Sequence, residues 1–264
     1  MSSIDAVVEA RNFGTGAAPG QYLGYGLQDV RLCMRLLMAG KGDVVSTEYL
    51  DDVAVRMANG RYLLEQCKSA LSTKNPVSDW SVDLWKTFTN WLETTNSLGL
   101  NPAKTDYILY VNPARTGRFV SALHEARSDG EVRELIAELR MELSSRKLAP
   151  ACASYLQMFL EADPALRTPM VRNFMLIAVP GDPVDEIRQH FDTAVSPAVI
   201  EVICSAAIGY AKILAANRIR AGGIAEIDAA DFRAKSAPSS GGTIAMKFCR
   251  ALRRVLTPPR WIAR

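Results

Sequence analysis

The first regular pattern of apolar and polar positions along the chain has the periodicity of a helix. Between residues 22 and 38, apolar side chains recur every three or four positions, and Ala39-Gly40 ends the run. Ser78 can cap a second helix, whose apolar face includes Trp85 and Trp91. Further helices are predicted near 117–147, 150–162, 183–192 and 197–221.

Shorter stretches between these helices have the apolar, β-branched composition of strands. They are residues 44–50, 51–57, 61–68 and 105–111, with 174–179 as a further candidate. Strands interspersed with helices predict an α/β protein. We expect a first unit at 1–115, a mainly helical assembly or support region at 116–235, and a linker with a basic tail at 236–264.

The second and third predicted strands are joined through Asn59-Gly60, a strong hairpin signal because both residues tolerate positive φ angles. In a two-residue turn the residues on either side of Asn59-Gly60 pair with each other, and that register places Asp51 opposite Lys68. A bulge or a longer loop would bring Asp52 onto that face instead. The sequence leaves the choice between the two aspartates open.

Composition narrows the class of protein. Of 264 residues, 48% are hydrophobic and 22% charged, as in an ordinary globular protein. The five cysteines form no CxxC pair, so neither a disulfide framework nor a thiolate zinc site is indicated. The N-terminus lacks a signal-peptide pattern, and the most apolar stretch, 194–216, is interrupted by Glu201 and Lys212. We therefore expect a cytoplasmic protein without a membrane span.

Charge is unevenly distributed along the chain. From Phe232 onward there are eight basic residues and no acidic one, although the whole chain carries only +3. Residues 1–231 therefore hold 23 basic against 28 acidic residues, a net charge of −5. This is a mildly acidic body with a basic tail, and such a tail can meet nucleic acid, an anionic membrane or a partner protein.

The predicted hairpin gathers residues suited to phosphodiester cleavage. Metal-dependent cleavage needs carboxylates to hold Mg²⁺ and a cation to orient water and offset developing charge. Asp51 and Asp52 begin one strand, with Glu48 just upstream, and Gln66 and Lys68 share one face of the next. Taken alone, this spacing is also that of a surface ion pair on an edge hairpin.

A family resemblance adds to this interpretation. The stretches GQYLGYGLQDVRLCMRLL, TEYLDDVAV, YLLEQCK and WSVDLWKTFTNWL together resemble the double-stranded-DNA endonuclease domain of cyclic-oligonucleotide (CBASS) antiphage effectors. Related bacterial defence nucleases are paired with a HerA-type ATPase. The family resembles restriction endonucleases of the PD-(D/E)xK type, and the match covers about residues 14–111.

The resemblance implies that residues 1–115 hold a restriction-endonuclease-like nuclease core, a mixed sheet with flanking helices. It also implies a Mg²⁺- or Mn²⁺-dependent DNA endonuclease. It favours Asp52 as the essential metal carboxylate, helped by Asp51 or Glu48. Gln66 would complete the coordination, and Lys68 would position the attacking water.

The sequence departs from the family pattern at one position, Gln66. Gln66 stands where a carboxylate is commoner, which weakens the expected metal binding. Gln28, on the first helix, would either reach the site or satisfy a buried backbone group. An acidic body binds double-stranded DNA poorly by itself, so we expect a homo-oligomer, or a HerA-type ATPase or sensor subunit, to supply positive surface.

Two other functions fit the sequence. One is a catalytically silent subunit that keeps the nuclease fold and uses the helices of 117–221 for assembly. The other is a membrane-surface adaptor that acts through the basic residues of the tail.

Overall fold

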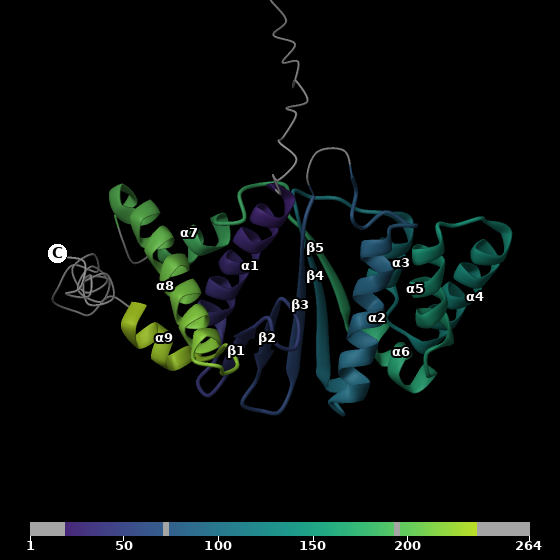
Figure 1. The fold of residues 1–264 in the computed structure, drawn as a ribbon, viewed down its shortest axis with the longest axis horizontal. Coiled ribbons are helices and arrows are strands. Elements are labelled where there is room, and N and C mark those ends of the chain that lie inside the picture. Colours follow the sequence, from purple (N-terminus) through teal and green to yellow (C-terminus); the bar gives the residue numbers. More distant parts are fainter. Residues whose placement is uncertain (1–18, 71–73, 193–195, 237–264) are drawn as a thin grey trace, which may run out of the picture.

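The computed structural model describes residues 19–70, 74–192 and 196–236. It is an α/β fold with one six-stranded mixed sheet between two layers of helices (Figure 1). The strand order is β5-β4-β3-β2-β1-β6. The strands are β1 (Val44–Thr47), β2 (Val53–Arg56), β3 (Tyr62–Ser69), β4 (Thr105–Asn112), β5 (Phe174–Ala178) and β6 (Glu226–Asp228).

The sheet changes from antiparallel to parallel pairing at β3. The strands β1, β2 and β3 pair antiparallel, and β6 pairs antiparallel with β1. The longer strands β3 and β4 pair in parallel over eight residues, and β5 continues the parallel part. Because β1 and β2 have only four residues each, their connecting turn lies beside the middle of β3 instead of at its end.

One helical layer is built around α1 (Pro19–Met38). This helix packs between the sheet and α8, and their shared core includes Cys33, Leu36 and Ala211. The other elements of this layer are α7 (Asp185–Asp192), η2 (Pro197–Val199), α8 (Ile200–Arg220) and α9 (Ala229–Ser236). The rings of Tyr210 and Phe232 stack and fix α9 to α8.

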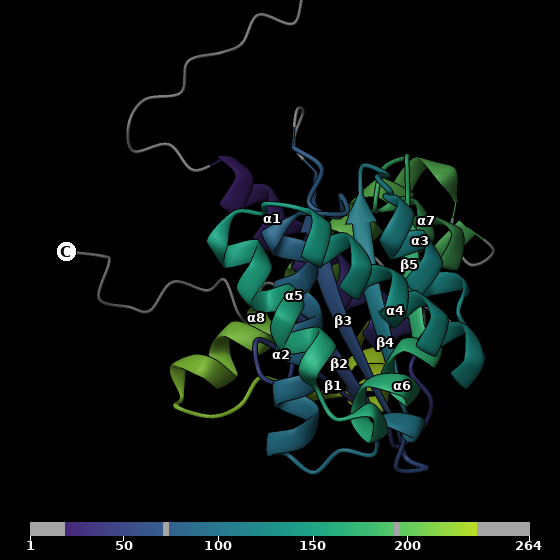
Figure 2. The same ribbon diagram turned by 90° about the vertical axis from the view of Figure 1, so that its right-hand side faces the viewer.

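The opposite layer is built around α2 (Val82–Ser97), which lies across the other face of the sheet (Figure 2). Its aromatic stripe is buried: Trp85 and Phe88 meet Phe159, and Trp91 meets Tyr107 and Phe174. The expectation that the tryptophans form core is therefore confirmed for Trp85 and Trp91. The remaining elements are η1 (Pro102–Lys104), α3 (Arg118–Glu125), α4 (Asp129–Ser145), α5 (Pro150–Glu161) and α6 (Pro164–Arg172).

Several predicted elements need correction. The cap of α2 is Ser81, whose side chain accepts a hydrogen bond from the Asp83 backbone, and not Ser78. The run 117–147 is two helices, because Ser128 starts α4 with a capping box. The candidate strand at 174–179 is confirmed as β5. The sequence interpretation missed α6, β6 and α9.

The boundary expected at residue 115 runs through the sheet. Both edge strands, β5 and β6, come from the region expected to be mainly helical. Residues 19–115 thus share one sheet with the segments that follow them. The basic residues of the tail beyond 236 lie outside the described residues.

One segment is long and apolar enough to cross a membrane, by length and composition alone. It is Pro197–Arg220, with a mean hydropathy of 1.8 in its most apolar window. In the structure this segment is η2 and α8, and α8 packs on α1 and α7. A single helix of this kind is weak evidence for a membrane protein, and the described fold is consistent with a soluble one.

Candidate functional site

The turn between β2 and β3 sets which aspartate faces the candidate site. Met57 and Arg61 are paired, since the Met57 N–H donates to the Arg61 carbonyl over 2.9 Å. The loop therefore has three residues and ends in Gly60, whose φ of 79° is left-handed. Val53 consequently pairs with Glu65, and the two-residue turn expected from Asn-Gly is wrong.

The observed register brings Asp52 opposite Gln66. Asp52 Oδ2 accepts a hydrogen bond from the Cys67 backbone N–H over 2.8 Å, and another from Gln66 Nε2. Continuing the strand pairing, Asp52 lies on the same face as Ala54, which is the face covered by α2. The longer loop does what a bulge was expected to do, and it places Asp52 on the Gln66 face.

Asp51 is held by a residue of the aromatic core. Its Oδ2 accepts a hydrogen bond from Trp91 Nε1 over 2.5 Å, and its Oδ1 accepts one from the Asp52 backbone N–H over 2.8 Å. The sequence interpretation treated Trp91 as core alone and missed this contact. The general need of a buried indole N–H for an acceptor was the available signal.

Glu48 and Gln28 reach the same place from two different elements. Glu48 follows β1 with a left-handed φ of 53°, and its backbone N–H donates to the Asp52 carbonyl over 3.4 Å. Gln28 comes from α1 on the other side of the sheet. It lies close enough to Glu48 and Asp52 to favour the charged forms of both carboxylates. Of the two roles expected for Gln28, the structure places it beside the carboxylates.

Lys68 is two residues beyond Gln66 on β3 and shares its face. It forms no ion pair with the described part of the chain. Its ammonium nevertheless lies within electrostatic reach of Asp51 and Asp52, because its positive charge opposes the rise that burial causes in the pKa values of both carboxyl groups. Cys67, between Gln66 and Lys68, is buried on the opposite face against Leu27 and Tyr110.

Burial and crowding raise the pKa values of all three carboxyl groups. Burial, followed by the charge of Asp52, raises the pKa of Asp51 to about 7, against the opposing effect of the Trp91 N–H. Burial also raises the pKa of Asp52, although the Cys67 N–H and Lys68 lower it. The pKa of Glu48 is raised by burial and by Asp52. Negative charge is therefore costly here, and a cation would relieve that cost.

These side chains border an open hollow of about 350 Å³. The hollow lies between the turn after β1 and the C-terminal half of α2. Asp51, Asp52 and Gln66 line it together with Asn90 and Glu93 of α2. Asn90 belongs to the Trp-rich stretch of the family resemblance, but no role at the site was predicted for it, and Glu93 was not singled out because it has the character of an ordinary polar position on a helix. Lys68 lines a different hollow next to this one.

The donor set suits a hard divalent cation. Carboxylate and amide oxygens are the ligands that Mg²⁺ and Mn²⁺ accept, and three carboxylates with raised pKa values are close together. Within residues 19–70, 74–192 and 196–236, however, no three His, Cys, Asp or Glu side chains are arranged as a ready metal site. To act as a ligand, Gln66 must present its amide oxygen instead of the nitrogen that donates to Asp52.

A buried charge cluster backs the site on the other face of β3. Glu65, next to Gln66, is fully buried and accepts hydrogen bonds from Arg31 and Arg35 of α1. Arg31 also donates to Glu186 of α7 over 2.8 Å and lies over the Tyr110 ring. Burial alone would lower the pKa of Arg31, but the two glutamates raise it above its ordinary value. This cluster fixes α1 on β3, and Gln28 is one helical turn from Arg31.

No family model, no curated protein and no solved structure matches the chain.

Proposed function

We propose that this protein is a metal-dependent DNA endonuclease that acts as an effector in bacterial antiphage defence. The observation that carries the proposal is the register of β2 and β3, which sets Asp52 against Gln66. Glu48, Asp51 and Lys68 lie around that pair. A helix packed on a mixed sheet with this residue set on neighbouring strands is what the resemblance to restriction-endonuclease-like enzymes implies. The role in defence rests on that resemblance alone.

Each side chain has a distinct task in this proposal. Asp52 is the principal carboxylate for Mg²⁺ or Mn²⁺, and Glu48 and the Gln66 amide oxygen complete the donor set. When bound, the cation polarises the scissile phosphate and lowers the pKa of a bound water. The Lys68 ammonium orients the attacking water and offsets charge on the phosphate oxygens. Asp51, tied to Trp91, holds the turn that carries Asp52.

We infer double-stranded DNA as the substrate, because the resemblance implies it. Since residues 1–231 are net acidic, a second copy or a partner subunit supplies further positive surface. A HerA-type ATPase or a sensor subunit is the partner type that the resemblance implies.

A catalytically silent subunit is the second candidate function. The observation that favours it is the lack of a ready three-ligand metal site among the described residues, together with a Gln66 amide that donates to Asp52. In this alternative the same contacts stabilise the hairpin, and the fold serves assembly.

Plasmid cleavage separates the two functions. Supercoiled DNA is incubated with the full chain in Mg²⁺, Mn²⁺, Ca²⁺ or EDTA, with and without the candidate partner. We expect cleavage in Mg²⁺ and Mn²⁺, little turnover in Ca²⁺ and none in EDTA. Asp52→Asn and Lys68→Ala should each abolish cleavage without loss of folding.

The matched control for Lys68→Ala is Lys86→Ala. Lys86 is exposed on α2 and lines neither of the two hollows that border Lys68 and Asp52. The Lys86→Ala variant should cleave DNA like the parent chain. Wild-type cleavage by Lys68→Ala would refute the assignment of the site, and absence of cleavage in every metal with every partner would favour the silent subunit.

A further inference from the structure

A second hollow, of about 810 Å³, adjoins the candidate site. Its lining comes from the start of α1, the end of β3, residues 74–81 and the start of α2. Among its lining residues are Gln21, Lys68, Ser69, Lys74, Ser78 and Asp83, whose side chains are polar or charged. Two of these side chains are cationic and one is anionic, so the hollow is net positive within an otherwise acidic body.

Most of the donors in this hollow have no acceptor on the protein. The side chains of Gln21, Lys68, Ser69, Lys74 and Ser78 make no hydrogen bond or ion pair with the residues that the structure describes. Asn75 differs, because its amide already bonds the Thr116 carbonyl and the Val77 N–H. These five side chains, two of them positively charged, are therefore free to bind an anion rich in acceptor oxygens, and phosphate is such a group.

The two hollows lie in line along two elements. On β3, Gln66 borders the first hollow and Lys68 the second, about 7 Å further along the strand. On α1, Gln28 lies beside the carboxylates, and Gln21 borders the second hollow about 10 Å away on the same helical face. At a rise of about 3.4 Å per nucleotide, these spacings correspond to two or three nucleotides of one strand.

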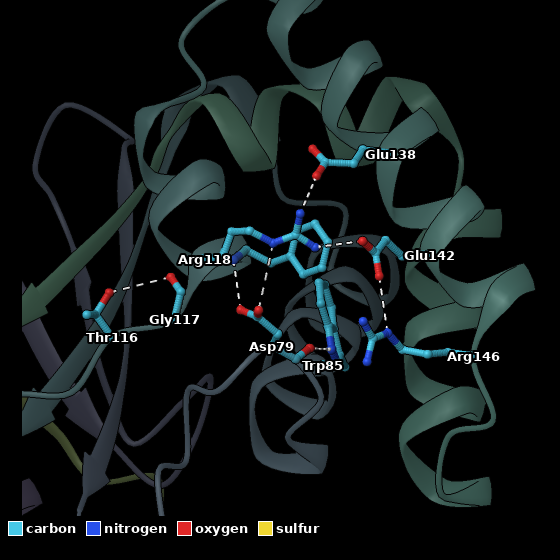
Figure 3. A network of polar contacts seen from close by, with 9 residues as sticks. Asp79, Trp85, Thr116, Gly117, Arg118, Glu138, Glu142 and Arg146 are labelled. Carbon is cyan, nitrogen blue, oxygen red and sulfur yellow. Dashed lines mark hydrogen bonds and ion pairs between the residues drawn. The ribbon is translucent and has the colours of Figure 1, made fainter.

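The wall of the second hollow that includes Ser78 and Ser81 is tied to the helices behind it through Asp79, whose contacts are drawn in Figure 3. Asp79 accepts a hydrogen bond from the Phe119 backbone N–H over 2.9 Å, and its carbonyl accepts one from Trp85. Arg118 reaches from Asp79 to Glu138 and Glu142 of α4. The wall is therefore held in place before any ligand arrives.

We propose that this second hollow binds the phosphodiester backbone of the DNA strand whose scissile phosphate lies at Asp52. Lys74 pairs with a phosphate, and Gln21, Ser69 and Ser78 donate to phosphate oxygens, while Lys68, at the border with the first hollow, keeps its role at the scissile phosphate. Asp83, at the start of α2, lines the same hollow, and its negative charge confines the positive potential to the side that carries Lys68 and Lys74. This inference rests on the proposed function and names where its substrate strand runs.

The test is binding of a fluorescein-labelled 20-base-pair DNA duplex to the full chain, followed by anisotropy in Ca²⁺ between 50 and 300 mM salt. Lys74→Ser should weaken binding about tenfold at low salt. It should also reduce the slope of log K against log salt by about 1, because one phosphate contact is lost. Gln21→Ala should weaken binding without changing the slope. Lys86→Ser on the outer face of α2 should bind like the parent chain.

The proposal is overturned if Lys74→Ser leaves affinity and slope unchanged, or if Lys86→Ser weakens binding as much. Cleavage measured in Mg²⁺ on the same variants separates this result from the fate of the enzyme assignment. Duplex binding that depends on Lys74, in a chain that never cleaves, supports the second hollow and refutes the nuclease. Cleavage that requires Asp52 but ignores Lys74 supports the nuclease and refutes the second hollow.

Discussion

Replacing Glu65 with glutamine should test the charge cluster that fixes α1 to β3. Glu65 is fully buried, and its two oxygens accept from two arginines. Glutamine keeps the shape but removes the charge, so both guanidinium groups lose their shared anion. Breaking a buried ion pair by removing one partner typically costs about 3–5 kcal/mol.

The structure places the expected cost at the lower end of that range. Arg31 keeps Glu186 as a partner, and the Arg35 side chain is 18% exposed and so keeps contact with water. We therefore expect Glu65→Gln to lower the free energy of unfolding by about 3 kcal/mol. For a domain with about 5–15 kcal/mol in total, this is a large part of the stability.

Urea unfolding followed by tryptophan fluorescence measures this loss. Trp80, Trp85 and Trp91 all belong to the opposite layer, so they report unfolding of the whole sheet and not a local change at α1. The matched control is Glu226→Gln, because its partner Arg56 is 3.9 Å away and both side chains are exposed. That variant should lose less than about 1 kcal/mol. Equal losses in the two variants, at equal m-values, would refute the reasoning.

Three further predictions concern the site and its surroundings. Because the pKa of Asp51 is raised in the folded state, its protonated form contributes stability that is complete below about pH 4 and is lost as the pH rises through about 7. Urea unfolding in EDTA should therefore show the free energy of unfolding falling over this pH range, and Asp51→Asn should reduce that fall by at most about 4 kcal/mol. An unchanged decline in Asp51→Asn would contradict the burial of that carboxylate. Gln66→Glu should tighten Mn²⁺ binding in calorimetry by adding a carboxylate beside Asp52, and an unchanged affinity would remove Gln66 from the donor set. Gly117→Ala should cost about 1–3 kcal/mol in thermal unfolding, because the added Cβ would lie 2.7 Å from the Val77 carbonyl oxygen, whereas Gly130→Ala, in more open space, should cost less.

Local patterns predicted most of the elements but not the register of the hairpin. Asn59-Gly60 fits both a two-residue turn and the end of a three-residue loop, because Gly60 is left-handed in either. One residue of loop length decides whether Asp51 or Asp52 lies on the face of the hairpin that carries Gln66 and Lys68. The resemblance favoured Asp52, and the turn geometry alone favoured Asp51.

Contacts between distant segments were harder to predict. Gln28 reaches the carboxylates only because β1 and β2 are short and leave room above their turn for α1. The short strand β6 has three residues, too few for an alternating pattern to be recognised, and α6 contains Pro169 within its span. The Trp91 contact to Asp51 joins segments 40 residues apart, so periodicity along the chain carries no trace of it.

The sheet order has a practical consequence for anyone who wishes to shorten this chain. β6, from residues 226–228, covers the free backbone edge of β1, and β5 covers that of β4. A fragment that stops at residue 115 would expose both edges and the face of α1 that meets α8. Bare strand edges recruit other strands, so such a fragment should aggregate before its chemistry could be measured. The smallest useful piece must extend through α9, even though the proposed catalytic and metal-binding residues, from Gln28 to Lys68, all lie before residue 70.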